Sequence, residues 1–179
     1  MTTEAGSSDR LSRSVEEHAY WAFEKLGRHD LSSPEEIWAA DAVDHFLPVC
    51  DAVGRDAIVA FLAELFAAFP DLRIEVENVV AAGSHAVVQW HGTGTFMGAP
   101  FQGIRPTGRK VDFRACDIVE LGEDNLVREN TIYWDGAGFA RQIGMLPPKG
   151  SILDRLVLAA FNTSTLVRTR GGRRLPGRR

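Results

Sequence analysis

The second half of the chain contains four strand-like segments in succession, and this succession constrains the fold more than any other feature of the sequence. The segments are rich in β-branched and aromatic residues and span residues 72–81, 86–95, 110–121 and 126–135. Turn-forming residues separate the first two segments at 82–84 and the last two at 122–125. The pattern predicts a meander of long strands. It disfavours a parallel nucleotide-binding sheet, in which strands alternate with helices.

Apolar residues at helical spacing come before the meander. Residues 15–26 show this spacing, and residues 55–69 show it more strongly, up to Pro70. Between them, Ser33-Pro34-Glu35-Glu36 has the pattern of a capping box and predicts a helix over 34–44. Helices first and strands afterwards predict an α+β domain, with the helices packed on one face of a curved antiparallel sheet.

The length of 179 residues suits one domain with tails. We expect a disordered N-terminal tail over 1–14, the domain over 15–147, a helical extension over 148–167 and a disordered arginine-rich tail over 168–179. We expect the extension to dock on the domain or on a partner subunit, because its apolar side chains form one stripe, made of Ile152, Leu153, Leu156, Val157, Ala160 and Phe161.

The final tail contains six arginines and no acid, whereas the whole chain has a net charge of −4. Such a segment has too few apolar residues to fold by itself. We interpret it as a solvated tail without a specific nucleic-acid partner, and contact with nucleic acid or with an anionic membrane is the alternative.

The composition indicates a cytoplasmic protein without a metal. Cys50 and Cys116 lie far apart, which is typical of thiols in a reducing compartment rather than of a disulfide framework. We find neither an apolar run of membrane-spanning length nor a secretory signal. The five histidines have no spacing suited to metal ligands, and the sequence has no cofactor motif. We therefore expect neither a metal nor a cofactor.

Two strands contain candidate site residues. In the segment 126–135, alternation places Glu129, Thr131, Tyr133 and Asp135 on one face. A face with this much polarity either meets water or lines a cavity in which chemistry takes place. In the segment 110–121, Asp117 interrupts an otherwise apolar face, and a buried acid is costly unless it is paired, protonated or functional.

The sequence resembles the SnoaL-like polyketide cyclase or ester cyclase branch of the nuclear transport factor 2-like (NTF2-like) superfamily. The matching stretches are GRDAIVAFLAELFAAFPD at 54–71, HGTGTFMGAPFQGIRPTGRKVDFRACDIVEL at 91–121 and LVRENTIYWDGAGFARQIGMLP at 126–147. The resemblance implies a cone-shaped fold, a cystatin-like α+β barrel, with N-terminal helices on the concave face of the sheet and an apolar pocket inside. It also implies a homodimer formed through the exposed sheet face, where Trp90, Ile132 and Trp134 would lie.

The resemblance assigns roles to residues of the pocket. Asp135 matches the strand-end aspartate that serves as general acid/base in the polyketide cyclases; the alternative is a surface aspartate that begins the turn into Gly136 and Gly138. Asp117 resembles in position the oxyanion-hole aspartate of ketosteroid isomerases. The residues expected to bind substrate are His45, Tyr133, Thr131, Phe113, Trp90 and Met97.

Three functions remain open. The first is a small cofactor-independent enzyme, a cyclase or isomerase, that acts on a hydrophobic carbonyl compound by acid/base proton transfer at carbon. Such a reaction needs a base and an oxyanion partner. The second is a non-catalytic ligand-binding or dimerisation module. The third is an epoxide hydrolase, which in this superfamily uses two aspartates and an arginine, and which Asp112 and Arg114 suggest.

Overall fold

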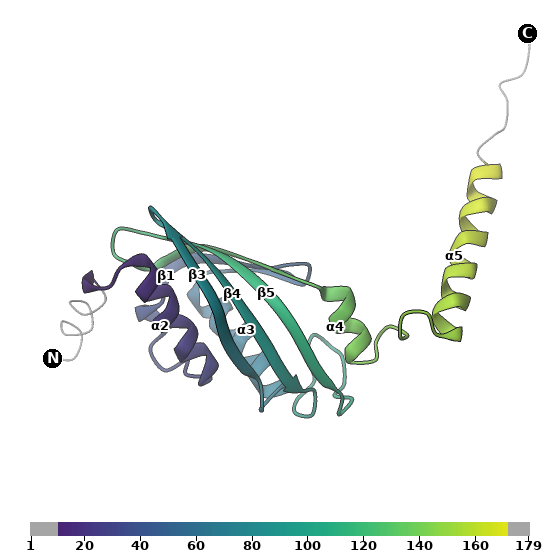
Figure 1. Cartoon of the computed structure of the whole chain (residues 1–179), viewed down its shortest axis with the longest axis horizontal. Helices are drawn as coiled ribbons and strands as arrows, with labels where there is room; N and C mark the ends of the chain where they lie inside the picture. Colours follow the sequence, from purple (N-terminus) through teal and green to yellow (C-terminus); the bar gives the residue numbers. More distant parts are fainter. Residues whose placement is uncertain (1–10, 172–179) are drawn as a thin grey trace, which may run out of the picture.

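A six-stranded mixed sheet covered by helices on one face forms the body of the protein (Figure 1). The structure, a computed structural model, describes residues 11–171, with side chains up to residue 165. Of the disordered tails expected over 1–14 and 168–179, the parts 1–10 and 172–179 lie outside the described residues, whereas residues 168–171 continue the helix α5. The elements are α2 (Val15–Gly27), the short 3₁₀ helix η1 (Pro34–Glu36), β1 (Trp38–Phe46), β2 (Cys50–Val53), α3 (Arg55–Ala68), β3 (Arg73–Ala82), β4 (His85–Thr95), β5 (Lys110–Leu121), β6 (Val127–Trp134), α4 (Gly136–Gln142) and α5 (Ile152–Gly171).

The four strands of the meander pair in chain order, as predicted. Strands β3, β4, β5 and β6 are neighbours in the sheet, and every pairing among them is antiparallel. The sheet then continues through β1 to β2 at the far edge. Because β1 runs parallel to β6, the sheet is mixed rather than wholly antiparallel. The α+β fold with helices on one face of a curved sheet is confirmed.

The helix predicted over 34–44 is wrong. The turn at Pro34–Glu36 is a single 3₁₀ turn, and the side chain of Ser33 makes no capping hydrogen bond. The chain then becomes strand β1, whose backbone pairs with β6 on one side and β2 on the other. Pairing on both sides and the burial of Trp38, Ala39 and Ala42 outweigh the local helical signal.

The concave face of the sheet packs against two helices. Helix α2 lies against β3 and β4, and α3 lies against β1 and β2. Alternation along β5 buries Val111, Ala115, Asp117 and Val119 towards these helices. The register shows which residues of the neighbouring strands face the same way. Asp117 pairs with Val88 on β4 and with Ile132 on β6, so these two residues also point towards the helices.

The outer face of the sheet, which was expected to form a dimer, therefore presents different residues from those predicted. Trp90, Ile132 and Trp134 line the interior, so they cannot form a contact on the outer face of the sheet. The outer face instead presents Val87 and Ile118, which pair directly across β4 and β5. Whether this face pairs two copies of the chain stays a prediction.

Candidate functional site

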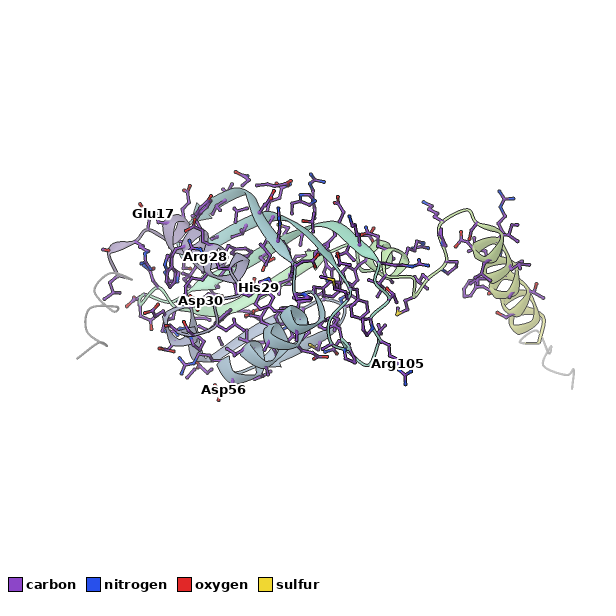
Figure 2. All side chains as sticks on the ribbon, turned by 90° about the horizontal axis from the view of Figure 1, so that it is seen from below. Glu17, Arg28, His29, Asp30, Asp56 and Arg105 are labelled. Atoms are coloured by element: carbon purple, nitrogen blue, oxygen red, sulfur yellow. The ribbon has the colours of Figure 1, made fainter. Side chains whose placement is uncertain are left out.

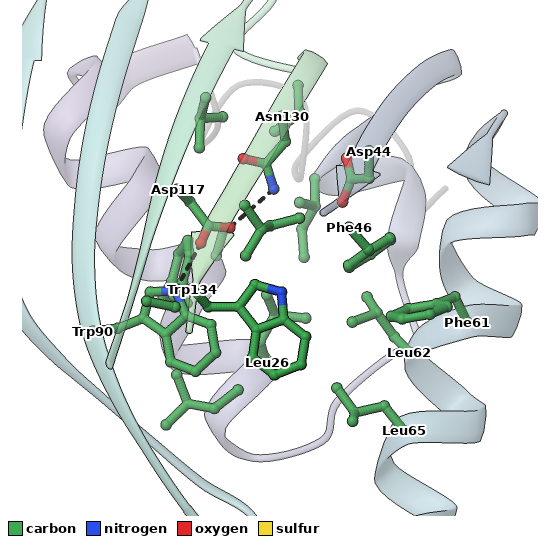
Figure 3. Close-up of a pocket in the computed structure, with 18 of the residues that line it drawn as sticks. Leu26, Asp44, Phe46, Phe61, Leu62, Leu65, Trp90, Asp117, Asn130 and Trp134 are labelled. Atoms are coloured by element: carbon green, nitrogen blue, oxygen red, sulfur yellow. Dashed lines mark hydrogen bonds between the residues drawn. The ribbon is translucent and has the colours of Figure 1, made fainter. Parts of the chain in front are cut away.

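An apolar cavity lies between the concave face of the sheet and the helices α2 and α3 (Figure 3). It holds about 1130 Å³ of empty space, counted out to the solvent at its mouth. Helix α2 contributes Leu26, and α3 contributes Phe61, Leu62 and Leu65 to its wall. Such a wall favours a ligand with a large apolar surface.

Three polar side chains meet inside this cavity, one from each of three adjacent strands. They are Asp44 of β1, Asn130 of β6 and Asp117 of β5, with 2%, 7% and 4% of their surfaces exposed. The parallel register places Asp44 directly opposite Asn130. Asn130 also reaches Asp117, because its Nδ2 donates to Oδ2 of that carboxylate over 3.0 Å. We call these three residues the Asp44–Asn130–Asp117 cluster.

The two acids of the cluster differ in their hydrogen bonds. Asp117 accepts from Asn130 and also from the indole N–H of Trp90, over 2.7 Å (Figure 3). Within residues 11–171, by contrast, Oδ1 of Asp44 is buried and has no hydrogen-bond partner, and the same holds for Oδ1 of Asn130. Unfilled acceptors at the wall of a cavity are sites that a hydrogen-bond donor of a ligand can fill.

Burial raises the pKa of both acids. Burial first, and then the negative charge of Asp117, raise the pKa of Asp44 to about 7. Burial likewise raises the pKa of Asp117 to about 6, although the hydrogen bonds from Trp90 and Asn130 lower it in part. The two groups titrate as a pair. Burial raises the pKa of Asp44 further than that of Asp117, and the charge of Asp117 adds to this rise, so Asp117 ionises first and Asp44 is partly protonated near neutral pH.

Asp135 does not lie in this cavity, so the predicted location of its side chain inside the pocket is wrong. Strand β6 ends at Trp134, and Asp135 becomes the N-cap of α4. Its exposed side chain accepts a hydrogen bond from the backbone N–H of Gly138 over 2.8 Å. The physical reason is local, because an aspartate before a helix satisfies one of the free N–H groups of the first turn.

Three of the residues expected to bind substrate face away from the cavity. His45, Thr131 and Tyr133 lie on the outer face of the sheet, because Asp44 and Asn130 occupy the inward positions of their strands. The ring of His45 bonds Asp51 over 2.8 Å and lies 3.5 Å from Glu129, so it belongs to a surface network of charges.

Of the other three residues expected to bind substrate, two line the cavity and one does not. Trp90 and Phe113 line the cavity, and their rings meet edge to face with centroids 5.5 Å apart. Met97 is 53% exposed and is not part of the wall.

The residues that suggested an epoxide hydrolase also lie outside the cavity. Asp112 bonds His91 over 2.8 Å on the outer face, and Arg114 pairs with Glu77 over 3.0 Å. The described residues contain no group of three or more side chains that could hold a metal ion.

The cavity also contains residues that sequence reasoning did not select. His18 of α2 is fully buried in the wall. Asn130 shares a face with Ile132 and Trp134, so it interrupts an apolar face just as Asp117 does, and this signal was available from the sequence. Asp44 gives a weaker signal, because the sequence places it beside His45 in a passage from a predicted helix to a strand.

The fold and the cavity together define a class of protein. A curved sheet with helices on its concave face, enclosing an apolar cavity with buried acids, is an NTF2-like α+β fold. Within this class the sequence pattern of the family described as "SnoaL-like polyketide cyclase" matches residues 17–143. The chain belongs to this family.

Solved structures support the fold. A candidate SnoaL-like polyketide cyclase from Jannaschia sp. CCS1 is 24% identical, with a TM-score of 0.65 over 82% of this chain and 97% of that one. AclR, a candidate hydroxylase from Streptomyces galilaeus, is 22% identical, with a TM-score of 0.64 over 88% and 98%. IdmH, a candidate polyketide cyclase from Streptomyces antibioticus, is 23% identical, with a TM-score of 0.63 over 74% and 99%. At these identities the likeness concerns the fold alone. No curated protein sequence matches the chain significantly.

Proposed function

We propose that the protein is a cofactor-independent enzyme that moves a proton at a carbon atom next to a carbonyl group in a hydrophobic substrate. A cyclisation or isomerisation of a polyketide-like compound fits this description. The observation that supports the proposal is the Asp44–Asn130–Asp117 cluster, buried in an otherwise apolar cavity. Buried polar groups destabilise a fold unless they are fully bonded, so a cluster with unfilled acceptors favours function over structure.

Asp44 is the acid/base in this proposal. Asp44 lines the cavity, its buried Oδ1 has no hydrogen-bond partner within residues 11–171, and its pKa of about 7 lets it exist in both protonation states near neutral pH. Asp117 is a positioning residue. Its charge raises the pKa of Asp44, and it accepts the hydrogen bond that fixes the amide of Asn130.

The proton balance of a turnover is simple. The carboxylate of Asp44 removes the proton from the carbon next to the carbonyl, and the C–H electron pair passes into an enolate. In an isomerisation, the enolate takes the proton back from Asp44 at another carbon. In a cyclisation, the enolate attacks a second carbonyl, and Asp44 gives the proton to the alkoxide that forms. Each path returns Asp44 to its starting state, so no external oxidant or reductant is needed.

The cluster also restricts the substrate. Two acids inside an apolar wall repel a ligand that carries a carboxylate, so we expect the substrate to be neutral. Oδ1 of Asn130 is a buried acceptor without a hydrogen-bond partner within residues 11–171, so a substrate hydroxyl or enol next to the reacting carbon supplies the missing donor.

The test uses β-tetralone, a neutral bicyclic ketone, as a probe. We expect the protein to speed deuterium uptake from heavy water at the carbons next to the carbonyl, measured by NMR. Asp44→Asn keeps the shape of the side chain but removes the base, and it should slow the exchange by about a hundred- to ten-thousand-fold.

The matched control is Asp135→Asn, which makes the same chemical change at the N-cap of α4. Because asparagine caps a helix about as well as aspartate, this variant should retain full exchange and stability. Loss of exchange in Asp135→Asn with retention in Asp44→Asn would overturn the assignment. Quenching of tryptophan fluorescence by the probe without any exchange would favour the non-catalytic binding module.

A further inference from the structure

Helix α5 lies apart from the body of the protein. Figure 1 and Figure 2 show it beyond α4 from two perpendicular directions, away from the sheet in both. The helix was expected to dock on the domain or on a partner subunit; it lies away from its own domain, and docking on a partner subunit stays a prediction. Its start is nevertheless well defined, because Oδ2 of the buried Asp154 accepts from the backbone N–H of Gly150 over 2.8 Å. The helix therefore begins at a defined residue and extends away from the body (Figure 1).

The exposed surface of α5 is strongly apolar. Ile152 is 79% exposed and Phe161 is 67% exposed. More than half of the surface of each remaining large apolar side chain on the first three turns is exposed as well, at Leu153, Leu156, Val157 and Leu158. An apolar stripe of this size on a soluble monomer marks a binding surface.

The charge of this end of the chain is opposite to that of the body. Residues 1–150 hold 13 basic and 23 acidic residues, which gives a net charge of −10. Residues 151–179 hold seven arginines and one acid, which gives +6, and six of the arginines follow Val167. An apolar helix and a cluster of arginines thus lie next to one another in the sequence.

We propose that α5 and the arginines at its end bind the surface of an anionic membrane. Helix α5 lies in the interface with its apolar stripe towards the lipid chains, and the arginines contact the headgroups. Among the described helices, none is long and apolar enough to cross a membrane, so α5 lies on the surface. The negative body is repelled by the same surface, which leaves α5 as the point of contact.

Other binding partners of α5 match its apolar surface and its arginines less well. Nucleic acid would match the arginines, but it would leave the apolar side chains of the first three turns in water. Pairing of two α5 helices in parallel would bury those side chains but bring together two arginine clusters of the same charge. Antiparallel pairing keeps the clusters apart, and the light-scattering measurement below detects it. The lipid surface satisfies both features of the segment, because it takes up the apolar side chains and binds the arginines.

The test is flotation of the full-length protein with vesicles of phosphatidylcholine, alone or mixed with phosphatidylglycerol. We expect binding to the mixed vesicles only, weakened by high salt. Replacing Arg173, Arg174, Arg178 and Arg179 by glutamine should weaken binding by on the order of a hundred- to a thousand-fold. The double variant Leu156→Glu/Phe161→Glu should abolish it.

The matched control is Tyr20→Glu/Met97→Glu, which adds the same charge at exposed apolar positions of the body and should preserve binding. Circular dichroism checks that each variant folds. Equal binding to both vesicle types, or binding unaffected by the changes in α5, would overturn the proposal. So would light scattering without lipid that shows an oligomer dissociated by the α5 variant, together with no vesicle binding, because the partner of α5 would then be a second copy of the chain.

Discussion

Replacing Asp44 by asparagine should stabilise the protein, and the gain should depend on pH in a way that only a buried acid explains. The pKa of this group is about 7 in the folded protein and 3.8 in the reference state. The difference of about three units corresponds to about 4 kcal/mol at 1.36 kcal/mol per unit. The raised pKa means that the folded state holds the proton more tightly than the unfolded state does. The wild-type protein is therefore most stable below the unfolded pKa, and it loses stability as the pH rises from 3.8 towards 7.

Asp44→Asn removes this loss. Between about pH 5 and about pH 8, the linkage relation predicts that the free energy of unfolding of the variant, minus that of the wild type, grows by about 2 to 3 kcal/mol. Any effect of the new amide on packing is the same at both pH values, so it cancels when the two results are compared. Urea unfolding followed by tryptophan fluorescence at both pH values measures the free energies of unfolding. A gain that is equal at both pH values would refute the reasoning, because it would mean that Asp44 is not desolvated in the folded protein.

Three further outcomes follow from the same geometry. Asp117→Asn should shift the pH–rate profile of β-tetralone exchange to lower pH, because loss of the neighbouring charge lowers the pKa of Asp44; an unchanged profile would mean that the two acids are not coupled. Trp90→Phe should cost about 1–3 kcal/mol in urea unfolding near pH 8, because it removes a donor from the buried carboxylate of Asp117, and the cost should shrink below about pH 6; a constant cost would indicate lost packing alone. If two copies pair through the outer face of the sheet, Ile118→Asp should reduce the mass measured by light scattering to that of a monomer, while Met97→Asp should not.

Much of the fold could be predicted because its signals are local. The meander strands alternate, and glycine, serine and asparagine define the turns between them. Strand β1 could not be predicted in the same way. Its sequence around Ala39 and Ala42 suits a helix as well as a strand, and its conformation depends on pairing with β6, which lies more than 80 residues further along the chain.

The candidate site could be predicted only in part. Asp117 was found because an acid in a long apolar face has few harmless explanations. Asp44 depends on the location of β1 and was therefore missed as a principal candidate. Asp135 was misplaced because a strand-end acid and a helix N-cap have the same local sequence, and only the end of β6 at Trp134 separates them.

A single irregularity in the sheet decides which face of β6 enters the cavity. Near the turn, Leu121 pairs with Val127, and continuation of that register would place Thr131 opposite Asp117. The register shifts by one between Glu120 and Leu121, so that Ile132 pairs with Asp117 instead. A shift of one residue exchanges the two faces of a strand. The extra residue is Arg128, whose guanidinium bonds Asp124 in the turn over 2.8 Å. Without this bulge, Thr131 and Tyr133 would face the cavity, as the sequence suggested, and Asn130 would face solvent. The hydrogen bond from Asn130 to Asp117 therefore depends on an irregularity that the alternating pattern of β6 does not reveal.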